Sequence, residues 1–129
     1  MSLEDEDLNR RLLRARDAMD RAYADPLNVP AVAAVAHISA AHFSRSFRAV
    51  FAETPHRYLQ RRRVERSMFL LRETERSVTD ISLDVGFNSL GTFSRTFREI
   101  VGETPSGYRG GHGPMAAPNC FQLAATRPR

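Results

Sequence analysis

Hydrophobic positions recur along this chain with helical spacing, and the clearest pattern occurs twice. The segment HFSRSFRAVFAETPHRY, which begins at His42, returns as TFSRTFREIVGETPSGY, which begins at Thr92, fifty residues later. In both copies two phenylalanines stand four residues apart, a spacing that places them on one face of an α-helix. We therefore expect both segments to be helices with a buried stripe. The stripe residues are Phe43, Phe47 and Val50 in the first copy and Phe93, Phe97 and Ile100 in the second.

A shorter apolar run precedes each copy, VAAVAHIS in the first and ISLDVGFNS in the second. Each run predicts a short helix that a tight turn joins to the next helix. Gly86 fits the second turn because glycine accepts a positive φ angle, whereas its counterpart His37 has to follow a similar path less comfortably. Ser39, and either Asn88 or Ser89, can cap the longer helices. The chain therefore predicts two helix-turn-helix units.

The remaining segments frame these units. A leading helix is expected from about Leu8 to Tyr23, with an apolar stripe and a stop at Asp25-Pro26. Each Glu-Thr-Pro is expected to end a helix, since the residue before proline avoids the α region. The segment HRYLQRRRVERSMFLLRET lacks glycine and proline and predicts a connecting helix. Its expected apolar positions are Leu59, Val64, Met68 and Leu71, and those of the leading helix are Leu8, Leu12, Ala15, Met19 and Ala22.

These elements predict five parts along the chain. They are an acidic tail over 1–7, a first helix-turn-helix subdomain over 8–57, a connecting helix over 58–74, a second subdomain over 75–109 and a tail over 110–129. The last part is rich in Gly, Pro and Ala and is expected to be flexible, with Phe121 and Leu123 as docking candidates.

Charge is distributed unevenly, and this favours a polyanionic partner. The 19 basic residues are all arginine, against 15 acidic residues, for a net charge of +4. Residues 1–40 carry five arginines and seven acids, whereas residues 41–110 carry twelve arginines and eight acids. Arginine presents a planar fork of donors that suits phosphate and guanine edges. A mixed, merely solvated surface is an equally weighted alternative until the motifs are considered.

The face opposite the phenylalanines carries small residues and arginine, which is typical of a helix that enters a DNA groove. Small side chains let the backbone approach base edges, and Arg45 and Arg95 are long enough to reach guanine. One exposed helix arginine would be ordinary, but its recurrence favours base contact. The candidate DNA-binding residues are Ala40, Ala41, His42, Ser44, Arg45 and Arg48 in the first helix and Leu90, Gly91, Thr92, Ser94, Arg95 and Arg98 in the second.

Other kinds of chemistry find little support in the sequence. The four histidines lack paired metal-ligand spacing and no nucleophile stands near a base, so we expect no metal, no cofactor and no enzyme. The single cysteine, Cys120, cannot form an intrachain disulfide. No apolar run approaches the ~20 residues that span a bilayer and the start is acidic, so we expect a cytoplasmic protein without membrane contact. The connecting-helix arginines Arg61, Arg62, Arg63 and Arg66 are expected to form a solvated face, with phosphate contact by some of them as the alternative.

These motifs resemble the DNA-binding domain of AraC/XylS-type transcription regulators. The most specific part runs from Asp80 to Arg109, with an isoleucine-containing first helix, a Gly-Phe turn, a Phe-Ser-Arg-x-Phe helix and a closing Pro-x-x-Tyr. The first unit is similar but looser, and the resemblance covers roughly Leu8 to Arg109. It implies an all-α fold of seven helices with two helix-turn-helix subdomains joined by a long connecting helix. It also implies two recognition helices in successive major grooves, about 34 Å apart, with base contacts from the candidate residues.

The leading hypothesis is a sequence-specific transcription regulator that binds double-stranded DNA as a monomer. The resemblance implies activation through RNA polymerase as the usual output, with repression as an open alternative. The chain is either a stand-alone regulator or a fragment of a longer one. An alternative is a protein-interaction module that modulates another regulator or RNA polymerase. A second alternative is a DNA-repair methyltransferase that methylates its own cysteine. The position of Cys120 outside both units, with no cysteine cluster, argues against it.

Overall fold

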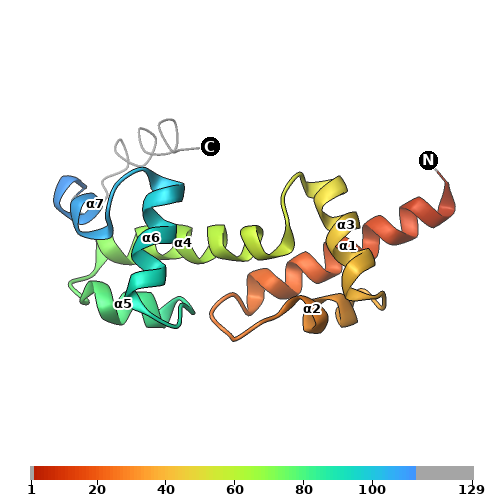
Figure 1. Ribbon diagram of the computed structural model, residues 1–129, viewed down its shortest axis with the longest axis horizontal. Helices are drawn as coiled ribbons and strands as arrows, with labels where there is room; N and C mark the ends of the chain where they lie inside the picture. The colour runs from red at the N-terminus through yellow and green to blue at the C-terminus, as the bar shows by residue number, and fades with distance from the viewer. Residues whose placement is uncertain (1, 113–129) are drawn as a thin grey trace. The chain divides into compact units, whose positions relative to one another are not determined.

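The computed structural model describes residues 2–112, and this part of the chain contains seven α-helices and no strand. An all-α fold of seven helices was the sequence-based expectation, and it is confirmed. The helices are labelled in Figure 1 and coloured by residue number. Their bounds are α1 (Leu3–Arg21), α2 (Val29–Val35), α3 (Ala40–Phe51), α4 (Pro55–Glu73), α5 (Val78–Asp84), α6 (Leu90–Val101) and α7 (Pro105–Gly111).

The chain divides into two compact units. Unit 1 is Met1–Arg62 and unit 2 is Arg63–Arg129, so the boundary falls inside α4. Unit 1 holds α1, α2, α3 and the first part of α4, and unit 2 holds the rest of α4 with α5, α6 and α7. Each unit therefore contains one of the repeated helix pairs.

Helix α1 begins earlier than the expected Leu8, and the segment expected to be an acidic tail is its first turn. The Ser2 hydroxyl accepts from the Asp5 amide at 3.1 Å, and the Asp5 carboxylate accepts from the Ser2 amide at 3.4 Å. This reciprocal cap and the acids Glu4 and Glu6 stabilise the helix start, where the backbone dipole is positive. The acidic residues are thus a helix-starting signal.

In unit 1, α1 and α2 pack against the phenylalanine-bearing face of α3. Helix α1 contacts α2 and α3, and α2 contacts α3. Phe43 and Phe47 are fully buried, with ring centroids 5.5 Å apart, and Tyr58 meets Phe47 edge-on at 5.6 Å. The core of this unit comprises Leu12, Ala15, Met19, Val32, Ala33, Ala36, Phe43, Phe47, Tyr58 and Leu59.

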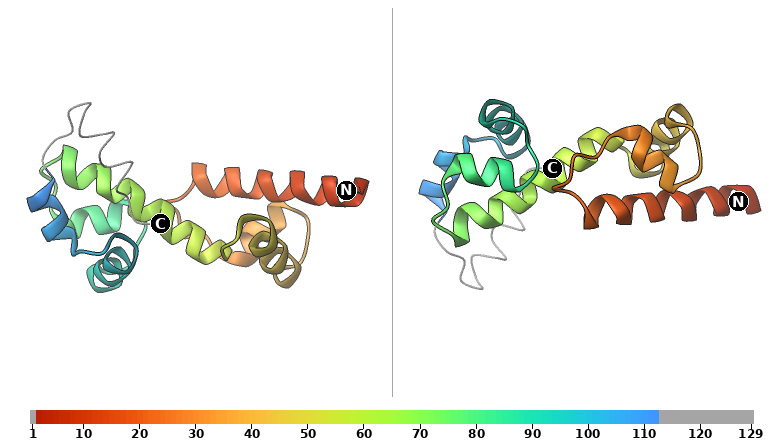
Figure 2. Two further views of the ribbon diagram at one scale, coloured as in Figure 1. Left: turned by 90° about the horizontal axis from the view of Figure 1, so that it is seen from above. Right: turned by 90° about the horizontal axis from the view of Figure 1, so that it is seen from below.

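Unit 2 repeats this aromatic arrangement around α6. Phe93 and Phe97 are fully buried with ring centroids 5.6 Å apart, and Tyr108 meets Phe97 edge-on at 5.7 Å. Figure 2 shows α5, α6 and α7 grouped with the second part of α4. The apolar positions expected in that part of α4 are all buried, namely Val64, Met68 and Leu71. The four phenylalanines are core residues, as the spacing predicts.

The tight turns adopt the backbone that the sequence predicts. His37 has φ 58° and Gly86 has φ 102°, so both occupy the left-handed region that glycine accepts readily. The first turn thus uses histidine where the second uses glycine. The caps also follow expectation, because Ser39 accepts from the His42 amide and Ser89, rather than Asn88, accepts from the Thr92 amide.

The expected role of Glu-Thr-Pro is wrong. Helices α3 and α6 end earlier, at left-handed C-cap residues Ala52 (φ 65°) and Gly102 (φ 97°). Pro55 and Pro105 then begin the next helices, because proline is favoured in the first helical turn, where its missing N–H costs nothing. Helix α4 therefore starts at Pro55 instead of 58.

Val50 also differs from expectation, since 46% of its side chain is exposed. It lies near the end of α3, where Phe51 rather than Val50 packs against the Phe47 ring, at 4.6 Å between centroids. Among residues 2–112, no helix has the length and apolarity that a membrane span requires.

Candidate nucleic-acid interface

The structure brings the candidate residues of each repeat to the outer side of one helix. In α3, Ala41, His42, Arg45 and Arg48 are exposed, and Ala40 and Ser44 are half-buried. In α6, Leu90, Gly91, Arg95 and Arg98 are exposed, and Thr92 and Ser94 are half-buried. The two helices therefore present similar outer faces at equivalent positions of the repeat.

The phenylalanines orient these faces. Arg45 stands midway between Phe43 and Phe47 in the sequence, and two residues correspond to about 200° of helix rotation. Because both rings are fully buried, the arginine between them has to point to solvent. The same argument places Arg95 opposite the buried Phe93 and Phe97 of α6.

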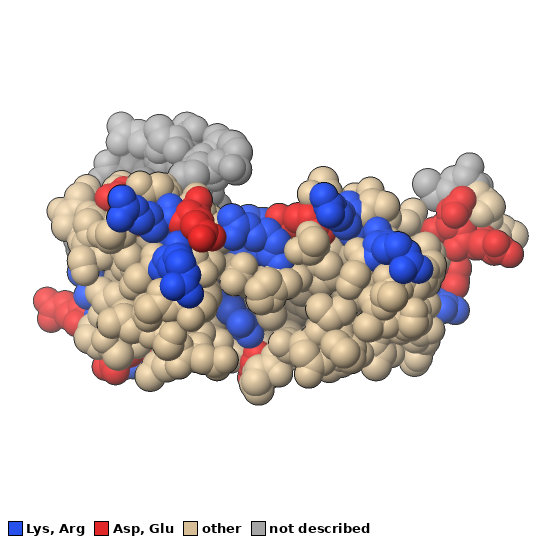
Figure 3. Space-filling view, in the orientation of Figure 1, with Lys and Arg blue, Asp and Glu red and all other residues tan. Residues whose placement is uncertain are grey.

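The arginines of these outer faces carry unengaged charge. Within residues 2–112, the side chains of Arg45, Arg48, Arg95 and Arg98 form no hydrogen bond and no ion pair. Their guanidinium groups can therefore meet an anionic partner without first breaking an intramolecular contact. Figure 3 shows arginine side chains standing out from the surface of each unit among largely uncharged residues.

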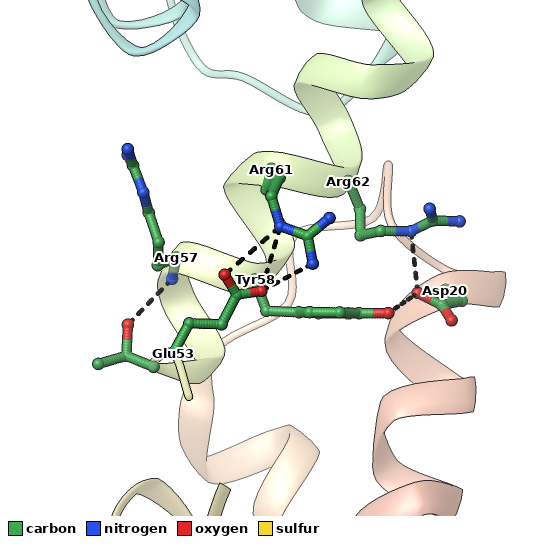
Figure 4. A network of polar contacts seen from close by, with 7 residues as sticks. Asp20, Glu53, Arg57, Tyr58, Arg61 and Arg62 are labelled. Carbon is green, nitrogen blue, oxygen red and sulfur yellow. Dashed lines mark hydrogen bonds and ion pairs between the residues drawn. The ribbon is translucent and has the colours of Figure 1, made fainter. Parts of the chain in front are cut away.

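The connecting-helix arginines of unit 1 keep the expected contact with solvent, and they are also engaged in ion pairs. The Arg61 guanidinium lies 2.8 Å from a Glu53 oxygen and 5.3 Å from the centre of the Tyr58 ring. Arg62 Nε lies 3.1 Å from Asp20 Oδ1. Figure 4 shows both pairs beside Tyr58. These arginines stabilise unit 1 and have less charge available to a ligand.

The connecting-helix arginines of unit 2 are also engaged. Burial lowers the pKa of Arg63, and the Arg66 guanidinium lies 4.8 Å from the centre of the Phe69 ring. Arg109 donates to the carbonyl oxygens of Leu71 and Thr74 at 3.0 and 3.3 Å, which satisfies acceptors at the C-terminal end of α4. Sequence reasoning missed this contact, since 38 residues separate Arg109 from Leu71.

Thr92 has a capping role besides its place on the outer face. The Ser89 hydroxyl accepts from the Thr92 amide at 3.2 Å and donates to the Thr92 hydroxyl at 3.0 Å. The threonine side chain is therefore held at the start of α6 and supports the helix end that carries Leu90 and Gly91. The Ser-x-x-Thr spacing was a signal for this pair that the sequence interpretation did not use.

His42 lies beside acidic residues that sequence reasoning did not connect to it. It lines a shallow hollow together with Glu4, Asp5, Asp7, Leu8, Arg11 and Ile38. Because three of these side chains are carboxylates, the hollow disfavours phosphate next to His42. Arg45 and Arg48 are therefore the better candidates for backbone contacts in α3.

Metal binding has no support in the part of the chain that the structure describes. Residues 2–112 contain no group of three histidine, cysteine, aspartate or glutamate side chains that could hold a metal ion. Cys120, on which the methyltransferase alternative depends, lies outside the described residues, as do Phe121 and Leu123.

Two helix-turn-helix units with arginine-bearing outer helices define a protein of the DNA-binding class. The sequence profile described as "Helix-turn-helix domain" matches residues 32–111. The regulatory protein SoxS of Salmonella typhimurium is 40% identical over 84 residues, which are 65% of this chain and 78% of SoxS. The chain belongs to the AraC-type helix-turn-helix family and is a DNA-binding transcription regulator rather than an enzyme.

Solved structures agree with this assignment. The DNA-binding domain of the global transcriptional factor AdpA, in complex with a target DNA, has a TM-score of 0.75 and 27% identity, over 78% of this chain and 91% of that one. An AraC-type transcriptional regulator from Chromobacterium violaceum has a TM-score of 0.73 and 28% identity, over 79% of this chain and 91% of that one. The family resemblance inferred from the motifs is thereby confirmed.

Proposed function

We propose that this protein recognises a specific duplex sequence by inserting the outer faces of α3 and α6 into the major groove, and activates transcription there. It binds as a monomer in the cytoplasm, since a single chain already carries two recognition helices, and it contacts RNA polymerase. The observation that carries the DNA-reading part is the recurrence of unengaged, exposed arginines at equivalent positions of α3 and α6.

The chemistry of these faces fits base reading. Arg45 and Arg95 can each donate two hydrogen bonds to O6 and N7 of guanine, a contact worth about 1–3 kcal/mol of discrimination against another base. The small residues at 40, 41 and 91 let the helix backbone approach the base edges. Arg48 and Arg98 lie one turn further along and suit phosphate oxygens, which carry affinity but no sequence information.

The similarity to the AdpA domain also supports the proposal. That domain was solved in complex with a target DNA, and it shares the fold of this chain over most of its length. The positions of α3 and α6 in the repeat give the present protein two helices that can serve the same purpose.

The direct test uses duplexes with a random core, from which the full chain selects its preferred sequence. We expect affinity for random duplex to fall steeply as salt rises, because phosphate contacts release condensed counterions. Arg95→Ala should weaken the selected site by about 10- to 100-fold, and random duplex much less. Arg14→Ala on α1 removes an equal charge from an exposed position and should change both affinities little.

Other results would point elsewhere. Equal losses on selected and random duplex would reduce Arg95 to a phosphate contact. If no sequence is selected and the affinity for duplex DNA does not change with salt concentration, the proposal is contradicted and the protein-interaction module is favoured. The number of chains bound per selected duplex tests whether the protein binds as a monomer. The amount of transcript that purified RNA polymerase makes from a promoter carrying that duplex tests activation.

A further inference from the structure

The amino-terminal end of α6 combines an exposed apolar side chain with a position that has no side chain at all. Leu90, the first residue of the helix, is 40% exposed. Next to it, a Cβ atom added to Gly91 would meet no heavy atom within 4 Å apart from its chain neighbours and the backbone of its own helix. An exposed leucine thus lies next to a position without a side chain at the start of α6.

The fold of the free protein does not require glycine at position 91. Gly91 lies inside a helix and does not have a positive φ angle, so its backbone does not call for glycine. Its surroundings do not call for it either, because a methyl group there would be unobstructed. Glycine is among the least favourable residues in a helix, so this position gives up stability.

The other copy of the repeat shows what is particular to α6. Ala40 and Ala41 occupy the positions of Leu90 and Gly91, so α3 begins with two small side chains of equal size. In α6 the first of these positions has the larger side chain of Leu90, and the second, Gly91, has no side chain. The two recognition helices therefore present different shapes to DNA, although their arginines coincide.

The absence of a side chain at Gly91 also bears on Arg95, which lies on the same face of α6. Residues 91 and 95 are one helical turn apart on the same face, and helical side chains lean toward the N-terminal end. Glycine at position 91 therefore places no side chain of its own between Arg95 and the N-terminal end of α6.

We propose that Leu90 contacts the C5-methyl group of a thymine, and that Gly91 provides the space in which the base pair approaches the helix. The inference rests on the proposed DNA-reading function and extends it to one base. The thymine methyl is the apolar group that a base presents in the major groove, and cytosine lacks it. An exposed leucine at the start of a groove-entering helix is suited to that group, whereas it offers nothing to phosphate.

The test replaces thymine by uracil, which removes only the methyl group. In the duplex that the full chain selects, each thymine is exchanged in turn, and the half-site of α6 is located by the positions at which Arg95→Ala relaxes the base preference. We expect one thymine of this half-site to lose about fourfold in affinity, as for one buried methyl group. Leu90→Ala should bind the thymine and uracil duplexes equally.

A matched control separates this effect from a general loss of apolar surface. Leu83 on α5 is 55% exposed, so Leu83→Ala makes the same chemical change in the same unit outside α6. This variant should keep the fourfold preference for thymine.

Gly91→Ala provides a second, independent readout. The added methyl group should raise the thermal midpoint of the free protein, because alanine favours the helix, and should weaken binding to the selected duplex, because it occupies the space for the base pair. Gly110 on α7 also has nothing within 4 Å of an added Cβ. Gly110→Ala should raise the midpoint without weakening binding.

The possible failures can be distinguished. If no duplex is selected, the proposed function fails, and the thymine contact fails with it. If a duplex is selected but uracil is tolerated throughout the α6 half-site, or Leu90→Ala keeps the preference for thymine, the thymine contact is wrong while the proposed function stands. If Gly91→Ala binds the selected duplex as tightly as the unchanged protein, the space at that position has no role in binding.

Discussion

The hydroxyl of Tyr58 donates a hydrogen bond of 2.6 Å to Oδ1 of Asp20, and thereby links α4 to α1 within unit 1 (Figure 4). The same oxygen accepts from Arg62 at 3.1 Å. Tyr108, the repeat counterpart fifty residues later, instead accepts a hydrogen bond from Arg72. The repeat thus preserves the packing of the tyrosine ring while it reverses the role of the hydroxyl, because the polar neighbours differ.

The Tyr58 contact predicts a loss of stability at high pH. Burial, followed by the hydrogen bond to Asp20 and the charge of Asp20, raises the pKa of Tyr58 to about 12. In the unfolded chain the tyrosine pKa is near 10, so the neutral phenol is favoured by folding. The stabilisation is therefore complete below about pH 10 and is lost as pH rises toward 12. Denaturant unfolding across this range should show the decline.

Tyr58→Phe separates this group from the other tyrosines. The variant should lose about 1.5 kcal/mol of unfolding free energy at neutral pH, since a hydrogen bond to a charged group is removed while Arg62 still pairs with Asp20. In a titration followed by ultraviolet absorbance, it should lack the step at about pH 12 that the raised pKa of Tyr58 predicts for the unchanged protein. If Tyr58 of the folded protein ionised near pH 10, this account of its contact with Asp20 would be wrong.

The left-handed residues predict two stabilising substitutions. His37 and Ala52 have φ 58° and 65°, where a Cβ atom is unfavourable, and their repeat counterparts are Gly86 and Gly102. His37→Gly and Ala52→Gly should each raise the unfolding free energy by about 0.5–1 kcal/mol, because relief of backbone strain exceeds the added freedom of the unfolded chain.

Ala49 provides the control for this prediction. It is exposed and lies within α3, three residues before Ala52. Ala49→Gly should lower the unfolding free energy by about 1 kcal/mol, since glycine is unfavourable inside a helix. The same chemical change therefore has opposite signs at the two positions. Equal signs in denaturant unfolding would contradict the role assigned to the left-handed backbone.

The N-cap of α6 predicts a coupling between helix stability and DNA binding. Ser89→Ala should cost about 1 kcal/mol of unfolding free energy, because the Thr92 amide loses its acceptor. Ser77, the N-cap of α5, accepts from the Asp80 amide at 3.0 Å, and Ser77→Ala should cost a similar amount. We expect only the Ser89 variant to weaken binding beyond its effect on stability, since it loosens the end of the helix that carries Leu90.

Ser89→Asp sharpens this test. Aspartate is as good an N-cap as serine, so stability should be retained, while its charge repels phosphate at the end of α6. A variant that is stable yet binds selected duplex weakly places this end of the helix close to DNA. Unchanged binding would mean that DNA does not approach it.

Local patterns in the sequence were sufficient to predict the helices and their cores. The spacing of Phe43 and Phe47, repeated at 93 and 97, indicates which face of each helix is buried. Helical periodicity depends only on residues close together in the sequence, so it can be predicted without the tertiary structure. The positive φ at Gly86 and the cap at Ser39 followed from the same kind of local chemistry. The acidic start was misread because residues 4–7 are all acidic, which is typical of a solvated tail, although Ser2 caps them as the start of a helix.

Only the tertiary structure decided which arginines are available to a partner. Arg45 and Arg61 both lie in segments that the sequence predicts to be helical. In the structure the Arg61 side chain is paired with Glu53, whereas the Arg45 side chain has no partner among residues 2–112. Likewise, 42 residues separate Arg62 from the Asp20 that holds it. Ion pairs depend on distances through space, which periodicity along the chain does not contain, and so the charged surface emerges only when the helices pack.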